Sequence, residues 1–196
     1  MSALKTMFQL TGRGYAAANL SNASLLIIDA QNEYLSGPLA LSGMEAATAN
    51  IALLLDAARK AKRPVVHIRH LGTVGGMFDP QGERGEFIKG LEPKEDEVII
   101  EKRLPNAFNN TGLKEALEKL GPLDVIVCGF MSHSSVSTTV RAAKDYGFRC
   151  TLVEDACATR DLPTPNGIIS AADVQRTEMA IMNDNFASLT RTQDLI

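Results

Sequence analysis

The segment GFMSHSSVSTTVRAA, from Gly129 to Ala143, follows a run of apolar residues and has the pattern of a helix start. A turn that carries a strand into a helix often presents a nucleophile, and the residue at the centre of this one is Ser135. Backbone N–H groups at a helix start are unpaired, so they can stabilise a developing negative charge. The segment is therefore a candidate nucleophile site, although its serines would also suit an ordinary capped helix.

Two charged residues follow other apolar runs. Asp29 closes SLLIID, where partial burial would raise the pKa of the carboxyl group and suit it to proton transfer. Lys102 follows DEVIIE, and a cation near Asp29 would hold the carboxylate ionised or complete a polar site. Each residue also has a structural interpretation, as a turn cap for Asp29 and as a solvated side chain for Lys102.

The elements that must position these residues alternate between apolar runs and helical patterns, which predicts a parallel sheet covered by helices on both faces. Ligands of such open α/β sheets bind beyond the carboxyl ends of the strands, where all three candidate residues lie. We expect a single α/β domain at 24–196, preceded by an N-terminal arm at 1–23. The expected strands are 24–30, 64–70, 96–102, 123–130, 149–156 and 186–190, and the expected helices are 43–62, 111–121, 170–183 and the one at the elbow.

Composition narrows the class of protein. The 196 residues are 45% hydrophobic, which is enough for one sizeable core. The formal charge of −3 lacks the basic footprint of a nucleic-acid-binding protein. No apolar run approaches the ~18 residues of a membrane span, and the N-terminus lacks the apolar region of a secretory signal, so a cytoplasmic location is expected. Cys128, Cys150 and Cys157 form no metal or disulfide pattern and are expected to be reduced, mostly buried thiols.

Four segments together resemble the isochorismatase-like (cysteine) hydrolase family over nearly the whole chain. They are LLIIDAQNEYLSG, VIIEKRLPNAFNNTGL, VIVCGFMSHSSVSTTVRAAKDYGF and TLVEDACATRDL. The resemblance implies a parallel six-stranded α/β fold, a Rossmann-like three-layer sandwich, in proteins that hydrolyse small amides, carbamoyl compounds or the vinyl ether of isochorismate. It also implies that Asp29 acts as the base and Lys102 as its partner.

Ser135 matches the nucleophile position and departs from the family's cysteine. A hydroxyl needs a neighbouring base, so efficient amide hydrolysis is in question. The resemblance further implies a cis peptide bond between Phe130 and Met131, with backbone N–H groups of Met131 and Ser135 aimed into the site as oxyanion donors. His133 is a candidate for capping or lining the site, and less so for catalysis, because a residue two positions away does not face Ser135 on a helix.

Several alternatives stay open. A vinyl-ether hydrolase would use Asp29 to protonate the substrate carbon and needs no covalent intermediate. An impaired relative would keep Asp29 and Lys102 as a buried ion pair and bind only a small ligand or a partner.

No cofactor is expected, and a metal-independent enzyme is favoured. His67 and His70 are three residues apart on a strand, so their side chains point to opposite faces and are not expected to share an ion. We expect His67 in or near the core and His70 lining the pocket.

The long segment 71–95 and the apolar arm need surfaces to cover them, and the resemblance implies dimers or larger assemblies. We therefore expect a homodimer, with a tetramer as the alternative, that acts on a small-molecule substrate and binds neither nucleic acid nor membrane.

Overall fold

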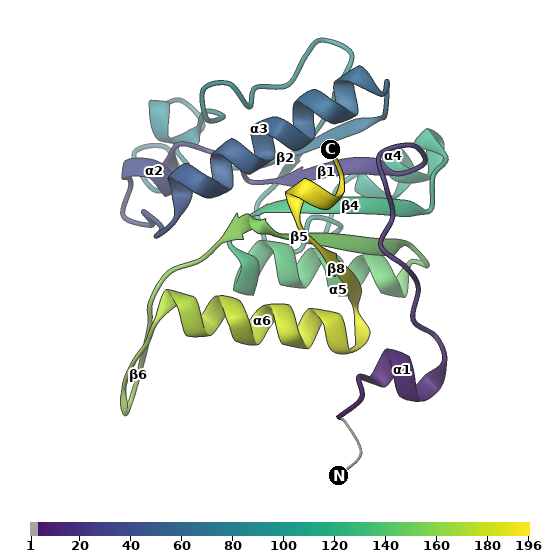
Figure 1. Ribbon diagram of the computed structural model, residues 1–196. Coiled ribbons are helices and arrows are strands. Elements are labelled where there is room, and N and C mark those ends of the chain that lie inside the picture. Colours follow the sequence, from purple (N-terminus) through teal and green to yellow (C-terminus); the bar gives the residue numbers. More distant parts are fainter. Residues whose placement is uncertain (1–3) are drawn as a thin grey trace.

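The computed structural model describes residues 4–196, which form an α/β fold around one six-stranded parallel sheet (Figure 1). The strand order is β3-β2-β1-β4-β5-β8. The fold class and all six expected strands are confirmed, with boundaries within two residues of those expected. The strands are β1 (Ser24–Ile28), β2 (Val65–His70), β3 (Val98–Lys102), β4 (Asp124–Phe130), β5 (Arg149–Ala158) and β8 (Ala187–Thr190).

Helices cover both faces of the sheet, as the alternating pattern predicts. Alternate residues of β1 point to opposite faces, and they separate the apolar core into two clusters: Leu25 and Ile27 pack with α3 (Met44–Lys60), whereas Leu26 and Ile28 pack on the other side. The second cluster includes apolar residues of α4 (Leu113–Leu120), α5 (Ser137–Asp145) and α6 (Ala171–Asn185). The result is a three-layer sandwich with its central strands buried.

Burial along the strands follows their place in the sheet. Every residue of β1 is buried, because the strand lies between β2 and β4 and is covered on both faces. The edge strand β3 is different, since Ile99 and Glu101 are exposed while Lys102 at its end is buried. The expectation of strands buried on both sides therefore holds for the centre of the sheet and fails at this edge.

Several short elements were not expected from the sequence. They include the small helices α1 (Met7–Thr11) and α2 (Glu33–Ser36), and a hairpin of β6 (Leu162–Thr164) and β7 (Gly167–Ile169) that projects past α6 (Figure 1). The side chain of Ile168 in this hairpin is 74% exposed. These elements are too short, or too poor in apolar periodicity, to stand out in the sequence.

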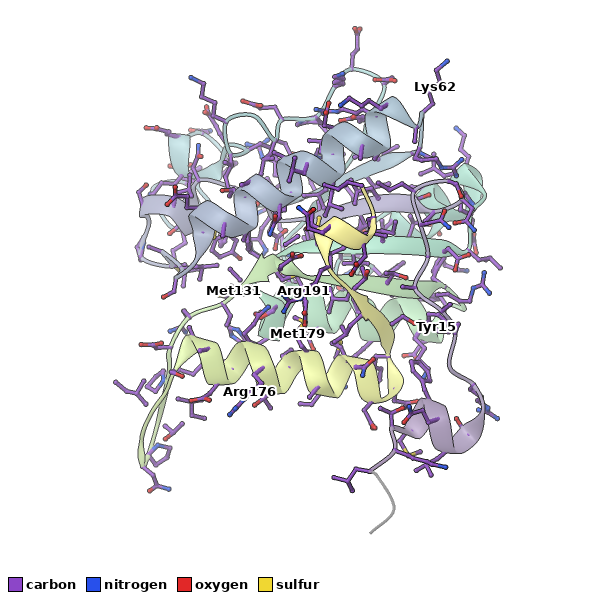
Figure 2. All side chains as sticks on the ribbon, viewed as in Figure 1. Tyr15, Lys62, Met131, Arg176, Met179 and Arg191 are labelled. Atoms are coloured by element: carbon purple, nitrogen blue, oxygen red, sulfur yellow. The ribbon has the colours of Figure 1, made fainter. Side chains whose placement is uncertain are left out.

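The described part of the N-terminal arm is fastened to the domain. Tyr15 belongs to the segment that joins α1 to β1 (Figure 2). The Tyr15 hydroxyl donates to the Cys150 carbonyl at 3.2 Å and accepts from the Cys150 amide at 3.1 Å. The amide of Ala18 donates to Thr151 Oγ1 at 2.8 Å. Residues 1–3 of the expected arm lie outside the described residues.

All three thiols are buried, as expected. Burial raises the pKa of Cys150 and of Cys157 to about 12, and raises that of Cys128 as well. Across residues 4–196, no helix combines the length and the apolar character that a membrane crossing requires.

Candidate active site

Asp29, Lys102 and Ser135 meet at the carboxyl edge of the sheet, as the sequence predicts. The Lys102 ammonium donates to Asp29 Oδ2 at 2.7 Å and to Ser135 Oγ at 3.1 Å. The exposed fractions of the three residues are 0%, 2% and 5% in chain order. A buried carboxylate, cation and hydroxyl are thus joined by hydrogen bonds.

The strand register explains this meeting. Ile28 at the end of β1 pairs with Ile68 of β2 and with Gly129 of β4, so Asp29 leaves the sheet beside both neighbours. Gly129 has φ +119°, and a Cβ there would lie 2.1 Å from the carbonyl oxygen of Ile28. Only glycine allows this close approach of β4 to β1. The approach brings the segment that carries Ser135 next to Asp29.

Burial raises the pKa of Asp29, and the charge and hydrogen bond of Lys102 oppose that shift. Oδ2 of this carboxylate is bound to Lys102, whereas Oδ1 is buried without a hydrogen-bond partner among the described residues. A buried acceptor without a partner is costly in a stable fold. Here it leaves one carboxylate oxygen free to take a proton.

The elbow begins as a π turn (Ser132–Val136) that leads into α5, where an α-helix start was expected. The Met131 carbonyl accepts from the amide of Ser134 at 3.0 Å and from that of Val136 at 3.2 Å, on either side of the Ser135 amide. The peptide bond between Phe130 and Met131 is cis, which confirms the geometry implied by the resemblance. Single π turns inside helices often occur at functional sites.

The other predicted residues of the elbow have separate surroundings. Phe130 is fully buried, with its ring centroid 5.7 Å from that of Tyr34, and Met131 is half-buried against the core. Met131 projects near the end of the sheet opposite to Tyr15 (Figure 2). The His133 ring binds Thr159 Oγ1 through Nδ1, and burial and the nearby charge of Arg160 lower its pKa. Nδ1 of His133 is therefore engaged with Thr159.

His70 contacts the polar cluster of Asp29, Lys102 and Ser135 directly, whereas the sequence predicted only that it would line the pocket. Its Nδ1 lies 3.0 Å from Lys102 Nζ, and burial, Lys102 and Arg103 lower the pKa of His70 to about 4. The imidazole is thus neutral at pH 7, and Nδ1 accepts a hydrogen bond from the ammonium. Lys102 has three donors, and these bonds use all of them.

Gln31 was missed in the sequence and fixes the backbone of His70. Its Oε1 accepts from the His70 amide at 2.7 Å, and its Nε2 donates to the His70 carbonyl at 3.0 Å. The sequence held only part of the signal, because Gln31 follows Asp29 by two positions. The position of His70 opposite Lys102 depends on the pairing of β2 with β3. A buried amide beside a buried carboxylate marks a polar site.

His67 lies on the opposite face of β2 from His70, as expected. It is fully buried, and its Nε2 lies 2.9 Å from Glu97 Oε2. Among residues 4–196, no three His, Cys, Asp or Glu side chains are grouped as metal ligands. Metal independence itself stays a prediction.

A cavity of about 360 Å³ adjoins this cluster at the end of β3. Lys102, Arg103 and Leu104 line one part of it, and Leu71 and Asn109 line another. The cavity offers both apolar and polar contacts beside the buried ammonium group, and its volume suits a small ligand.

The fold and the buried polar cluster define an α/β protein whose candidate site lies at the carboxyl edge of a parallel sheet. The family model described as "Isochorismatase domain" matches residues 23–194, and the chain belongs to this family of hydrolases. A crystal structure of an isochorismatase from Pseudomonas putida KT2440 is 68% identical, with a TM-score of 0.97 over 99% of this chain and 100% of that one.

Curated relatives extend this comparison. An uncharacterised isochorismatase family protein, YddQ of Bacillus subtilis, is 39% identical over 87% of this chain and 96% of its own. Nicotinamidase 3 of Arabidopsis thaliana is 34% identical over 72% of this chain and 75% of its own.

One further relative is named a secreted protein. The secreted isochorismatase effector Isc1 of Verticillium dahliae is 35% identical, and the match covers 100% of both chains. A cytoplasmic location for the present chain stays a prediction.

Proposed function

We propose that the chain is an amide hydrolase that uses Ser135 as nucleophile, Asp29 as general base and acid, and Lys102 as an electrostatic partner of both. The observation that carries this proposal is the Lys102 ammonium group, which bridges Asp29 Oδ2 and Ser135 Oγ. It holds the hydroxyl beside the carboxylate and would stabilise the negative charge that develops on Oγ. A relative named nicotinamidase also supports an amide as the substrate.

In the first half of the reaction, Ser135 Oγ attacks the amide carbonyl as its proton passes to Asp29. The Oγ–C bond forms, and the electron pair of the carbonyl moves onto its oxygen. Asp29 then gives the proton to the leaving nitrogen, and the C–N bond breaks to leave an ester on Ser135. The free Oδ1 and the raised pKa of Asp29 suit both proton transfers.

In the second half, water replaces the amine. Asp29 takes a proton from the water as the water oxygen attacks the ester carbonyl. It gives the proton to Ser135 Oγ when the bond between Oγ and the carbonyl carbon breaks. The backbone amides of Met131 and Ser135 are the proposed donors to the carbonyl oxygen in both halves. Lys102 acts in both halves through its hydrogen bonds to Asp29 and Ser135 and transfers no proton.

Arg160 suggests that the substrate carries a negative charge. Its Nε is buried without a hydrogen-bond partner among the described residues, and its Nη1 donates only a long bond, 3.3 Å, to the Asp161 carbonyl. It lies close enough to His133, in the elbow, to lower the pKa of that ring. A guanidinium group with free donors at the edge of a site favours a carboxylate on the substrate.

Vinyl-ether hydrolysis is the second candidate. It is favoured by the raised pKa of Asp29, because a carboxyl group that holds its proton more firmly can deliver it to a substrate carbon near neutral pH. In that reaction Ser135 would only donate a hydrogen bond. A binding-only protein is the third possibility, in which Asp29 and Lys102 form a structural ion pair.

Turnover of matched substrates separates these functions. Succinamate and its methyl ester are amides that differ in one negative charge, and isochorismate supplies the vinyl ether. Amide turnover that is lost in both Ser135→Ala and Asp29→Asn supports the proposal. Vinyl-ether turnover that survives Ser135→Ala and is lost in Asp29→Asn supports the second candidate. Turnover of none of the three compounds favours binding alone.

The same pair of amides tests the role of Arg160. A charge-assisted hydrogen bond is worth ~1.5–3 kcal/mol, so succinamate should be preferred by roughly 10- to 100-fold in kcat/KM. Arg160→Gln should remove this preference and leave turnover of the neutral ester unchanged.

A further inference from the structure

Glu33 is a buried carboxylate outside the proposed catalytic cluster. It is fully buried at the start of α2, and its Oε2 accepts from the Phe78 amide at 3.0 Å. Arg84 Nη1 lies 3.6 Å from the same oxygen. A Cβ at Gly37 would lie 2.1 Å from Glu33 Oε1, so a glycine at this position makes room for the carboxylate. A buried charge is costly, and the one hydrogen bond that this carboxylate accepts from the described residues comes from the Phe78 amide.

Phe78 is held in an unusual backbone conformation. Its φ of +51° is rare for a bulky residue, and its carbonyl accepts from the amide of Gly72 at 3.0 Å. Glu33 thus binds the amide of Phe78, and Gly72 binds its carbonyl. Such backbone strain persists only where the surrounding structure enforces it, and it is often found beside functional sites.

The Phe78 ring lies over the polar cluster. Its centroid is 4.8 Å from that of His70 and 5.2 Å from that of Tyr34. On its other side His70 contacts Lys102 Nζ at 3.0 Å. A continuous series of contacts therefore runs from the Glu33 carboxylate through the Phe78 ring and the His70 imidazole to Lys102.

We propose that Glu33 is a positioning residue, which holds Phe78 in its left-handed conformation so that the ring covers His70 and keeps the imidazole a neutral acceptor for Lys102. This inference rests on the proposed function only in that Lys102 belongs to the proposed site. Without the cover, water would reach His70. A protonated imidazole would then repel the Lys102 ammonium, which would weaken its bonds to Asp29 and Ser135.

The alternative is that Glu33 only neutralises Arg84. Arg84 Nη2 donates to the Gly76 carbonyl at 3.0 Å, so its guanidinium has another partner in the same loop. The separation of 3.6 Å from Glu33 is also longer than the bond from the Phe78 amide. The carboxylate is therefore directed mainly at Phe78.

Titration of His70 by NMR tests this proposal without any substrate. The chain has three histidines, so the ring signals can be assigned by single replacements. The charges that act on His70 are those of Lys102 and Arg103, and all the variants keep both. In the native protein His70 should titrate near pH 4. Glu33→Leu, which removes the acceptor at similar size, should raise that midpoint by at least one pH unit toward the ordinary 6.5.

Three further variants complete the test. Phe78→Ala should raise the His70 midpoint as Glu33→Leu does, whereas Glu33→Gln keeps an acceptor oxygen for the Phe78 amide and should shift it far less. Glu83→Gln changes an exposed carboxylate of the same loop and should leave it unchanged. His67 and His133 serve as internal references. An unmoved His70 midpoint in Phe78→Ala, or equal shifts in Glu33→Gln and Glu33→Leu, would overturn the proposal. If Glu33→Leu fails to fold, an unmoved His70 midpoint in Phe78→Ala still overturns the proposal.

A kinetic measurement distinguishes this inference from the proposed function. If the amide hydrolase activity is found, Phe78→Ala should lower kcat about tenfold, and the activity should fall at a higher pH on the acid side than in the native protein. A shifted His70 with no turnover of any substrate would uphold the positioning role and reject the hydrolase. Normal turnover with an unmoved His70 midpoint would uphold the hydrolase and reject the positioning role.

Discussion

The carboxylate of Asp29 and the ammonium group of Lys102 form a fully buried ion pair, with 2.7 Å between Oδ2 and Nζ. Taking two charges out of water costs several kcal/mol each, so such a pair contributes little to stability compared with apolar residues of the same size. The pair does, however, bind the neighbouring hydroxyl group of Ser135 through Lys102. The pair places a carboxylate and a cation beside the hydroxyl group that we propose as the nucleophile.

Replacement of Asp29 by Asn should abolish amide turnover while keeping the fold. The amide has nearly the same size as the carboxylate and cannot accept the proton, so we expect kcat to fall by roughly 10²- to 10⁴-fold. Steady-state rates with circular dichroism as a folding control measure this. Retention of more than a tenth of native kcat in a folded variant would remove Asp29 from the role of base.

The acid limb of the activity profile should report the ionisation of Asp29. Burial raises the pKa of this carboxyl group, and the base must be ionised, so activity should fall as the pH drops through a value above the ordinary 3.8. A pH series of kcat/KM measures it. Activity that stays constant down to pH 3.8 would contradict the assignment.

Apolar runs and strand ends predicted the sheet, because they are local patterns. They also made Asp29, Lys102 and Ser135 candidates, but the family resemblance was needed to choose these residues over their structural interpretations. Gln31 and His70 were harder to place, since their roles depend on which strand pairs with β2. Phe78 and Glu33 could not be placed at all. Their contact joins α2 to a loop 45 residues away, and the positive φ of Phe78 has no glycine to signal it.

Acid should weaken the fold through Glu97. Partial burial raises its pKa, but the bonds from Arg59, from the Lys94 amide and from His67 outweigh this and lower the pKa to about 2. As the pH falls, the carboxylate of Glu97 takes up a proton in the unfolded state before it does so in the folded state. Its stabilising effect is therefore complete above its ordinary pKa of 4.5 and is lost as the pH falls toward about 2.

The pH dependence of unfolding in Glu97→Gln tests this effect. At pH 7, urea titration should give a free energy of unfolding that is about 1–3 kcal/mol lower than in the native protein, because Arg59 loses a paired carboxylate. The difference should shrink as the pH approaches 3. An equal difference at both values would show that the charge of Glu97 is unimportant. Glu95→Gln, an exposed neighbour, is the matched control.

We expect the protein to form a homodimer, with a tetramer as the alternative. The projecting hairpin leaves Ile168 74% exposed and Ile169 44% exposed, and an isolated two-stranded hairpin is marginally stable in water. A partner that covers these side chains would stabilise it. Light scattering at micromolar concentration should give at least twice the monomer mass of 21.1 kDa. Ile168→Lys should reduce that mass, and a monomer in the native protein would rule the assembly out.

The most direct measurement of the nucleophile site is the alkylation of Ser135→Cys by iodoacetamide at pH 7, followed by mass spectrometry of the labelled peptides. Residue 135 lies at a helix start beside Lys102, which favours a reactive thiolate, whereas the other three thiols are buried with raised pKa values. Rapid labelling at residue 135 that slows at least tenfold when Lys102→Met is added is the predicted result. A thiol at position 135 that stays unlabelled while the variant is folded would contradict the account and favour a protein that only binds its ligand.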